Sequence, residues 1–158
     1  MEDIGNILVE ELESMRGRIV ANMQSADQVV TGQTVDSIKV EQYAPNAARI
    51  TARPYFSALE TGTQPWRNQY PKPPRFFVDI IREWADAKGL SLNAFLTAGK
   101  IMREGSLLYR TGGRKDIFTN EVEATKSAIT SRLTASLTAA FRDAADFGQY
   151  RDTYPDNI

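Results

Sequence analysis

The chain has 158 residues, of which 42% are hydrophobic and 25% are charged, and its formal net charge is −1. These values are typical of one globular domain, and a charge near zero provides no overall attraction to nucleic acid or acidic lipid. No apolar run approaches the roughly 20 residues that span a bilayer. The start of the chain is amphipathic and acidic, unlike a secretory signal, so we expect a protein without membrane contact that stays in the cytoplasm or leaves it by a route that needs no signal.

The sequence contains neither cysteine nor histidine. The absence of cysteine excludes disulfides, thiol nucleophiles and thiolate metal sites. The absence of histidine removes the commonest general base near neutral pH and the commonest metal ligand. An enzyme would have to work with carboxylates, lysine, tyrosine, serine or threonine alone. We therefore predict a protein with no catalytic activity, no cofactor and no metal.

The N-terminal part is predicted to form a helix followed by a β-hairpin. Apolar residues recur every three or four positions up to Met23, on one face of a helix: Ile4, Ile7, Leu8, Leu12, Met15, Ile19 and Met23. Residues 38–43 and 48–53 alternate apolar and polar side chains, and Ala44-Pro45-Asn46 between them is typical of a turn. An antiparallel hairpin with one buried face follows, and then a short helical turn that ends at Gly62.

Residues 64–75 form a proline-rich segment, with four of the seven prolines of the chain between Pro65 and Pro74. Proline fixes φ, removes a backbone donor and favours extended neighbours, which predicts a stiff projecting arm. The alternative is a solvated connector whose aromatic side chains pack back onto the domain.

The remaining sequence is predicted to form three helices. The first carries Phe76, Phe77, Ile80, Ile81 and Trp84 on one side and ends at Gly89. Ser91 is the expected N-cap of a second helix that runs to about Tyr109, before the break at Gly112-Gly113. Asp116 is the expected N-cap of a long C-terminal helix, and residues 148–158 are expected to form a flexible tail.

The predicted fold is therefore α+β: an N-terminal helix, a small antiparallel hairpin, a projecting arm and three helices, the last of them long. Residues 1–147 are predicted to be a single connector domain, in which 64–75 are the arm and 76–114 a helical insertion.

Three groups of residues could carry chemistry. Gly112-Gly113-Arg114-Lys115 is similar to an anion-binding nest but lacks the spacing of a Walker motif, and a turn between helices explains it better. Asp79, Glu83 and Asp86 share one helix face, which is the expected solvent side of that helix rather than a magnesium site. Glu60 and Gly62 are interpreted as fold-forming, since turn chemistry explains them without a ligand.

The arm and its surroundings interleave aromatic and basic side chains, and these residues are the candidate interaction site: Arg53, Tyr55, Trp66, Arg67, Tyr70, Lys72 and Arg75. This composition suits a surface that stacks bases and follows phosphates, and it also suits a protein–protein hot spot. The near-zero net charge favours a protein partner. A single-stranded nucleic-acid-binding domain remains the alternative.

Two short motifs stand in a familiar order on either side of the predicted hairpin. Thr31-Gly32 is followed by Ser37-Ile38, and after the hairpin come Tyr55, Leu59-Glu60 and Gly62-Thr63. This arrangement resembles the HK97 gp10-like family of bacteriophage tail-component proteins, which complete the tail or join it to the head. The resemblance covers residues 1–63 and, more loosely, 115–145. Family members pass through a short arm into a Pro-Phe-Leu-type helix start, where this chain has Asp116-Ile117-Phe118 after the additional residues 64–114.

The resemblance implies a structural virion protein: a subunit of a homo-oligomeric neck or tail-completion ring, in contact with portal, adaptor and tail proteins. Such a ring would lie in the neck or tail of the virion, would assemble in the host cytoplasm and would allow passive contact with DNA in its channel. A carboxylate-dependent enzyme centred on Glu60 and Asp79 is the third interpretation, and no substrate suggests itself for it.

Overall fold

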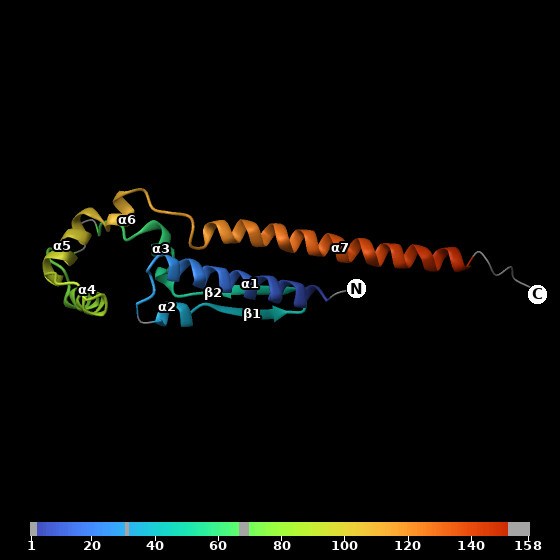
Figure 1. Cartoon of the computed structure of the whole chain (residues 1–158), viewed down its shortest axis with the longest axis horizontal. Helices are drawn as coiled ribbons and strands as arrows, with labels where there is room; N and C mark the ends of the chain where they lie inside the picture. The colour runs from blue at the N-terminus through green and yellow to red at the C-terminus, as the bar shows by residue number, and fades with distance from the viewer. Residues whose placement is uncertain (1–2, 31, 67–69, 152–158) are drawn as a thin grey trace, which may run out of the picture.

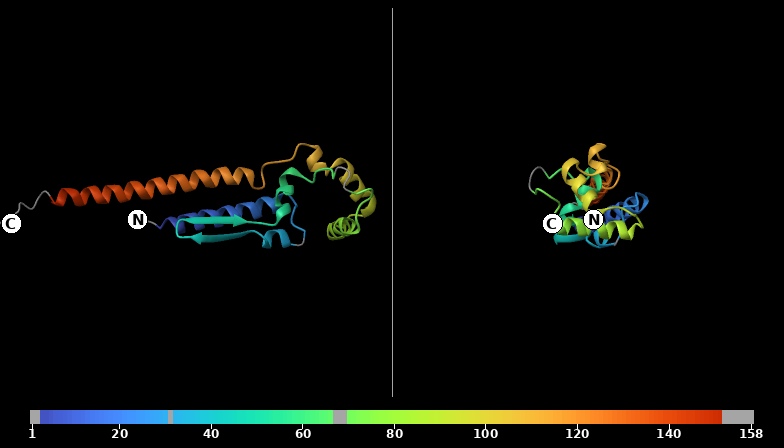
Figure 2. Two further views of the ribbon diagram at one scale, coloured as in Figure 1. Left: turned by 180° about the vertical axis from the view of Figure 1, so that it is seen from behind. Right: turned by 90° about the vertical axis from the view of Figure 1, so that its left-hand side faces the viewer.

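The protein has the α+β fold that its sequence predicts. A computed structural model describes residues 3–30, 32–66 and 70–151, of which 146–151 are described by their backbone alone (Figure 1). The molecule is elongated: the long C-terminal helix α7 (Thr119–Arg151) runs beside the N-terminal helix α1 (Ile4–Ser25) and extends past its start. A group of helices forms the opposite end of the molecule, as Figure 2 shows from behind.

Helix α1 buries the face that its periodicity predicts. Asp3 caps its N-terminus by accepting a hydrogen bond from the backbone N–H of Asn6 at 3.2 Å. The side chains of Ile7, Met15, Ile19 and Met23 are buried along one side. This row packs on the hairpin and on α7, so α1 is the centre of the main body.

The hairpin consists of β1 (Lys39–Ala44) and β2 (Ala47–Thr51), paired antiparallel. Val40 lies opposite Ile50, and the register shifts at a bulge between Gln42 and Ala44. Both strands lie against α1. Their turn approaches the start of α1 so closely that a Cβ at Gly5 would lie 2.4 Å from the carbonyl oxygen of Pro45.

Short helical segments complete the main body: α2 (Gln33–Asp36), the 3-10 helix η1 (Pro54–Ser57) and α3 (Ala58–Thr61). The buried core here contains Met15, Ile19, Met23, Ile38 and Ile117, with Ile50, Phe56, Leu59 and Val122 packed around it. The rings of Phe56 and Phe118 lie 5.2 Å apart between their centroids. Residues from both ends of the chain therefore share one core.

A second, smaller core lies in the helical insertion, formed by α4 (Arg75–Ala87) and α5 (Ala94–Glu104). Its buried residues are Phe77, Val78, Ile81, Ala94, Ala98 and Met102. Lys88, at the end of α4, pairs with Asp27 after α1 and ties the insertion to the main body.

Two predicted helix boundaries in the insertion were wrong. The N-cap of α5 is Asn93 rather than Ser91, because the Asn93 side chain accepts from the N–H of Leu96 at 3.1 Å. Helix α5 also ends at Gly105 (φ 82°) rather than near Tyr109, and a separate turn, α6 (Leu107–Arg110), follows. A Cβ at Gly105 would lie 2.6 Å from the Tyr109 ring, so the close packing and the left-handed φ both favour glycine there.

Helix α7 continues to Arg151, so residues 148–151 of the predicted tail are helical, and 152–158 lie outside the described residues. Among the residues that the structure describes, no helix combines the length and apolarity that crossing a membrane requires.

Candidate functional site

Glu60 connects the main body, the insertion and α7 through hydrogen bonds. Its side chain is only 3% exposed. One carboxylate oxygen accepts the backbone N–H groups of Ile117, Phe118 and Thr119 at 2.7–3.0 Å, and the other accepts the Thr119 hydroxyl. The free N–H groups at the start of α7 are therefore capped by a carboxylate that lies far away in the sequence.

This geometry lowers the pKa of Glu60. Burial alone would raise the pKa, but the hydrogen bonds from the Thr119 hydroxyl and from the three backbone N–H groups outweigh it and hold the pKa below 4.5. The group is thus ionised and fully occupied by donors of its own chain. This is the arrangement of a structural cap, as the interpretation of Glu60 as fold-forming predicts.

The predicted N-cap Asp116 does not cap α7. Its carboxylate forms two hydrogen bonds of 2.6 and 2.7 Å with the guanidinium of Arg114. Its hydrogen bond with Arg114 lowers the pKa of Asp116 to about 2. The local sequence signal was misleading because Glu60 already satisfies the helix N-terminus.

The glycine pair before Arg114 forms a turn that lies against Glu60. Gly112 and Gly113 have φ of 91° and 76°. A Cβ at Gly113 would lie 2.7 Å from the carbonyl oxygen of Glu60, which accepts the N–H of Arg114 at 2.9 Å. Close contact with the backbone of Glu60 accounts for Gly113, and the left-handed φ of the turn accounts for Gly112, without an anion.

The face that carries Asp79, Glu83 and Asp86 is the solvent side of α4. Asp79 pairs with Arg82 at 2.6 Å and with Arg75 at 3.8 Å. It shares no hydrogen-bond network with Glu60. Over the described ranges of the chain, no group of three or more acidic side chains is arranged to hold a metal ion.

The candidate interaction residues fall into two groups that the structure does not merge into one surface. Arg53 and Tyr55 lie beside α2, where the Arg53 guanidinium donates to Gln33 at 3.1 Å and to the Tyr55 hydroxyl at 2.7 Å. The remaining described members, Trp66, Tyr70, Lys72 and Arg75, belong to the arm, and Arg67 lies outside the described residues.

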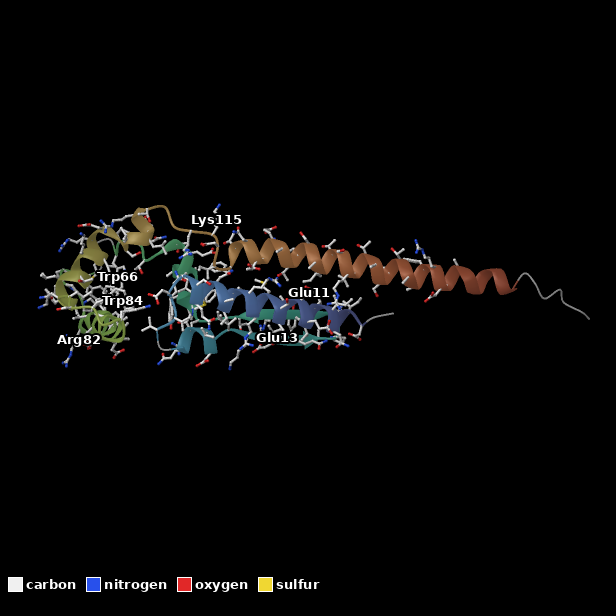
Figure 3. The ribbon with its side chains drawn as sticks, viewed as in Figure 1. Glu11, Glu13, Trp66, Arg82, Trp84 and Lys115 are labelled. Atoms are coloured by element: carbon white, nitrogen blue, oxygen red, sulfur yellow. The ribbon has the colours of Figure 1, made fainter. Side chains whose placement is uncertain are left out.

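The described ends of the arm lie along the insertion instead of projecting from it. The N–H of Trp66 donates to the carbonyl of Met102 at 2.9 Å, and the Trp66 ring lies 4.6 Å from that of Phe77. Figure 3 shows Trp66 and Trp84 together within the insertion. The aromatic side chain of Trp66 thus packs back onto its own domain, which is the arrangement that the alternative interpretation predicts.

A cleft of about 590 Å³ runs along the arm and α4. Tyr70 and Phe95 supply aromatic surface, and Lys72, Arg75 and Arg82 supply positive charge. Asp79 lies in the same cleft and pairs with both arginines. The positive charge available to a phosphate chain is therefore reduced.

Two exposed apolar surfaces were not recognised from the sequence. The first is a row on α4, Phe76, Ile80 and Trp84, which are 56%, 55% and 40% exposed. The prediction placed these three on the buried side with Phe77 and Ile81, and only the latter two are buried. The sequence feature that could have predicted this exposed row is the width of the apolar arc of α4, about 200° at 100° per residue. A surface helix buries an arc of little more than about 100°, so part of a wider arc stays exposed.

The second exposed apolar surface is the distal part of α7. Residues 133–141, LTASLTAAF, contain no charged side chain, and Leu137 and Phe141 are 46% and 73% exposed. The sequence feature that could have predicted this surface is the absence of charge in a helix that is too long for the rest of the chain to cover.

A polar network positions α7 on α1. The Arg18 guanidinium donates to Glu121 at 2.5 Å and to Thr125 at 2.8 Å, and Asn22 donates to Glu121 at 3.1 Å. These hydrogen bonds, above all the one from Arg18, lower the pKa of Glu121 despite its partial burial. Further along, Arg132 pairs with Glu10 and Glu11.

The same contacts define where α7 loses its support. Since the pairs run antiparallel, from Asn22–Glu121 to Glu11–Arg132, the first turn of α1 lies opposite about residue 138. The rest of α7, to Arg151, extends about 20 Å beyond α1 at 1.5 Å per residue.

Comparison of the chain with protein-family models, with curated proteins and with solved structures returned no match.

Proposed function

We propose that the protein is a structural subunit of a neck or tail-completion ring of a tailed bacteriophage, located between the portal or adaptor and the tail. The observation that carries this proposal is the distal part of α7, where residues 133–141 carry no charge and expose Leu137 and Phe141. The order of motifs through Gly62-Thr63, which resembles that of tail-component proteins, supplies the phage context.

Exposed apolar surface of this kind is costly to leave in water. Burial of apolar area stabilises a contact by about 25 cal/mol per Å², and contiguous apolar patches on folded proteins mark interaction sites. The distal part of α7 and the row on α4 lie at opposite ends of the molecule (Figure 1). A subunit with neighbours on two sides would cover both of them.

The polar centre of the molecule supports the same function. Glu60, the most buried carboxylate in the described ranges of the chain, is saturated by donors of its own chain and caps a helix. Its role is therefore to hold α7 in a fixed direction, which a subunit that projects a long helix requires.

Native mass spectrometry with negative-stain imaging tests this function, on the protein alone and mixed with the portal, adaptor and tail proteins encoded beside it. We expect rings, or a defined complex with one of these proteins. A protein that binds none of them and forms no ring contradicts the proposal.

The alternative function is binding of single-stranded nucleic acid along the cleft beside the arm. The exposed ring of Tyr70 next to Lys72 and Arg75 is the observation that favours it. It predicts strongly salt-sensitive retention of an oligonucleotide. The pairing of Asp79 with Arg75 and Arg82 argues for weak retention, so the structural function is preferred.

A further inference from the structure

The near-zero net charge of the chain conceals two regions of opposite charge. Residues 64–114, which form the arm and the insertion, contain nine basic and four acidic residues, a net charge of +5. The rest of the chain contains ten basic and sixteen acidic residues, a net charge of −6. Charge that is separated in this way is typical of a region that meets a polyanion, which an average over the whole chain does not reveal.

The positive charge of this region is least compensated between the arm and α5. Three of the four acidic residues belong to α4, and the fourth, Glu104 on α5, pairs with Arg110 at 3.1 Å. By contrast, Lys72 in the arm and Arg103 on α5 take part in no ion pair within the described ranges of the chain. Both cations are therefore available to an anion from outside.

A cleft of about 640 Å³ between the arm and α5 brings these two cations together with aromatic side chains. Its lining includes Lys72 and Arg103, the exposed ring of Tyr70 and the half-buried ring of Trp66. No carboxylate of the described residues lines it, whereas Asp79 lies in the cleft along α4 and pairs with both arginines there. The cleft beside α5 is therefore the more positive of the two.

Gly99 keeps the cleft beside α5 open. It lies within α5, and a Cβ at this position would lie 3.5 Å from the Pro73 side chain and 3.6 Å from the guanidinium of Arg103. A larger side chain would therefore fill the space between the arm and the helix. With the glycine in place, the volume of the cleft falls within the range of about 300–1,000 Å³ that is usual for ligand sites.

We propose that the cleft between the arm and α5 binds single-stranded nucleic acid, with a phosphate held by Lys72 and Arg103 and a base stacked on Tyr70. Unpaired cations attract phosphates, and an exposed aromatic ring stacks on any base. An acidic peptide would use the two cations but not the face of the ring, so a nucleotide suits the cleft better. The site differs from the cleft of the alternative function, and it does not rest on ring formation, because one copy contains all of it.

Fluorescence anisotropy of a short labelled oligothymidylate, mixed with the full chain over a range of salt concentrations, tests the site. Arg103→Glu and Lys72→Glu each reverse one cation of the cleft, and each should weaken binding at least about fivefold. Each should also make the plot of log affinity against log salt concentration shallower by about 0.7, the contribution of one phosphate contact of a single strand. Both side chains are exposed and unpaired, so the fold should persist, as circular dichroism will show.

Two further variants separate the cleft from net charge and stacking from phosphate contact. Lys115→Glu changes the net charge by the same amount at an exposed position before α7, outside the cleft (Figure 3), and binding should stay within about twofold of wild type. Tyr70→Ala removes the stacking surface and should weaken binding of the oligothymidylate at least about fivefold. Binding of an abasic strand of the same length should be almost unchanged by Tyr70→Ala.

Four results would overturn the inference. Wild type that retains no oligothymidylate at low salt excludes the site. Equal weakening in Lys115→Glu and Arg103→Glu means that net charge alone attracts the strand. Loss in Arg82→Glu without loss in Arg103→Glu assigns the strand to the cleft along α4. Displacement of the strand by polyglutamate at equal charge concentration means that an acidic protein surface is the ligand.

The test is independent of the proposed function. Rings and complexes with portal, adaptor or tail proteins are measured without nucleic acid, and strand binding is measured on the protein alone. A protein that assembles but retains no strand contradicts this site only. A protein that retains the strand but neither forms a ring nor binds its neighbours contradicts the proposed function only.

Discussion

The main body and the helical insertion differ in how completely they bury their own apolar side chains. In the main body, α1 buries its apolar face between the hairpin and α7, and the polar ends of the core are satisfied by Glu60, Arg18 and Asn22. In the insertion, α4 and α5 bury one side of α4 and leave a second apolar row in solvent. The apolar side chains buried in each core stabilise the fold, whereas the exposed row on α4 remains available for a partner.

Helix α7 contains the same contrast within one element. Its first half is tied to α1 by ion pairs and hydrogen bonds from Glu121 to Arg132. Its second half retains helix-forming alanines, an exposed leucine and an exposed phenylalanine, and it runs past the start of α1 after about residue 138. Since the first half fixes the direction of the second, changes at the base of α7 should affect both folding and assembly.

The largest effect is expected at the base of α7. Glu60→Ala leaves three backbone N–H groups without an acceptor, that of Ile117 buried and those of Phe118 and Thr119 partly buried, and we expect the free energy of unfolding to fall by about 3 kcal/mol. Chemical denaturation measures this loss. Glu60→Gln keeps an acceptor oxygen and should lose less, while Glu123→Ala on the exposed side of α7 is the control, within about 0.5 kcal/mol of wild type. Equal stability of Glu60→Ala and wild type would refute the role of Glu60 as a cap.

The second effect separates the two cores. Trp66→Ala removes a ring packed on Phe77 and should destabilise the insertion by about 2–3 kcal/mol. Because the insertion has its own core, hydrogen exchange should accelerate in α4 and α5 and remain slow in α1. Ile19→Ala, in the main core, should instead accelerate exchange throughout. A uniform response to Trp66→Ala would mean that the two cores unfold as one unit.

The third effect tests the close approach of the hairpin to α1. A Cβ at Gly5 would lie 2.4 Å from the Pro45 carbonyl oxygen, so Gly5→Ala should cost about 1–2 kcal/mol. Gly17 lies in the same helix with open space around it, and Gly17→Ala should stabilise the protein by up to about 1 kcal/mol. Thermal melting of the two variants should therefore show shifts of opposite sign.

These tests also show how far the sequence can predict the molecule. The apolar spacing of α1 and the hairpin with its turn at Pro45-Asn46 appear in the structure, because each depends on neighbours in the chain. The predicted buried face of the hairpin was wrong: no residue of β1 or β2 is buried, and exposure does not alternate regularly along either strand. The cap of α7 by Glu60 could not be predicted in this way, since it joins residues far apart in the sequence, and the local candidate Asp116 pairs with Arg114 instead. The candidate interaction residues were chosen by composition, which does not distinguish the half-buried Trp66 from the exposed Phe76.

The fourth effect is a loss of stability in acid. The folded-state pKa of Glu60 lies below its ordinary 4.5 because the Thr119 hydroxyl and the backbone N–H groups favour the carboxylate more than burial opposes it. A carboxyl group with a lowered folded-state pKa contributes its full stabilisation above the unfolded-state pKa and loses it as the pH falls through the folded-state value. The melting temperature should thus decline below about pH 4.5, and Glu60→Gln should show a flatter profile. Identical acid profiles for Glu60→Gln and wild type would assign the loss to other carboxylates, such as Glu121.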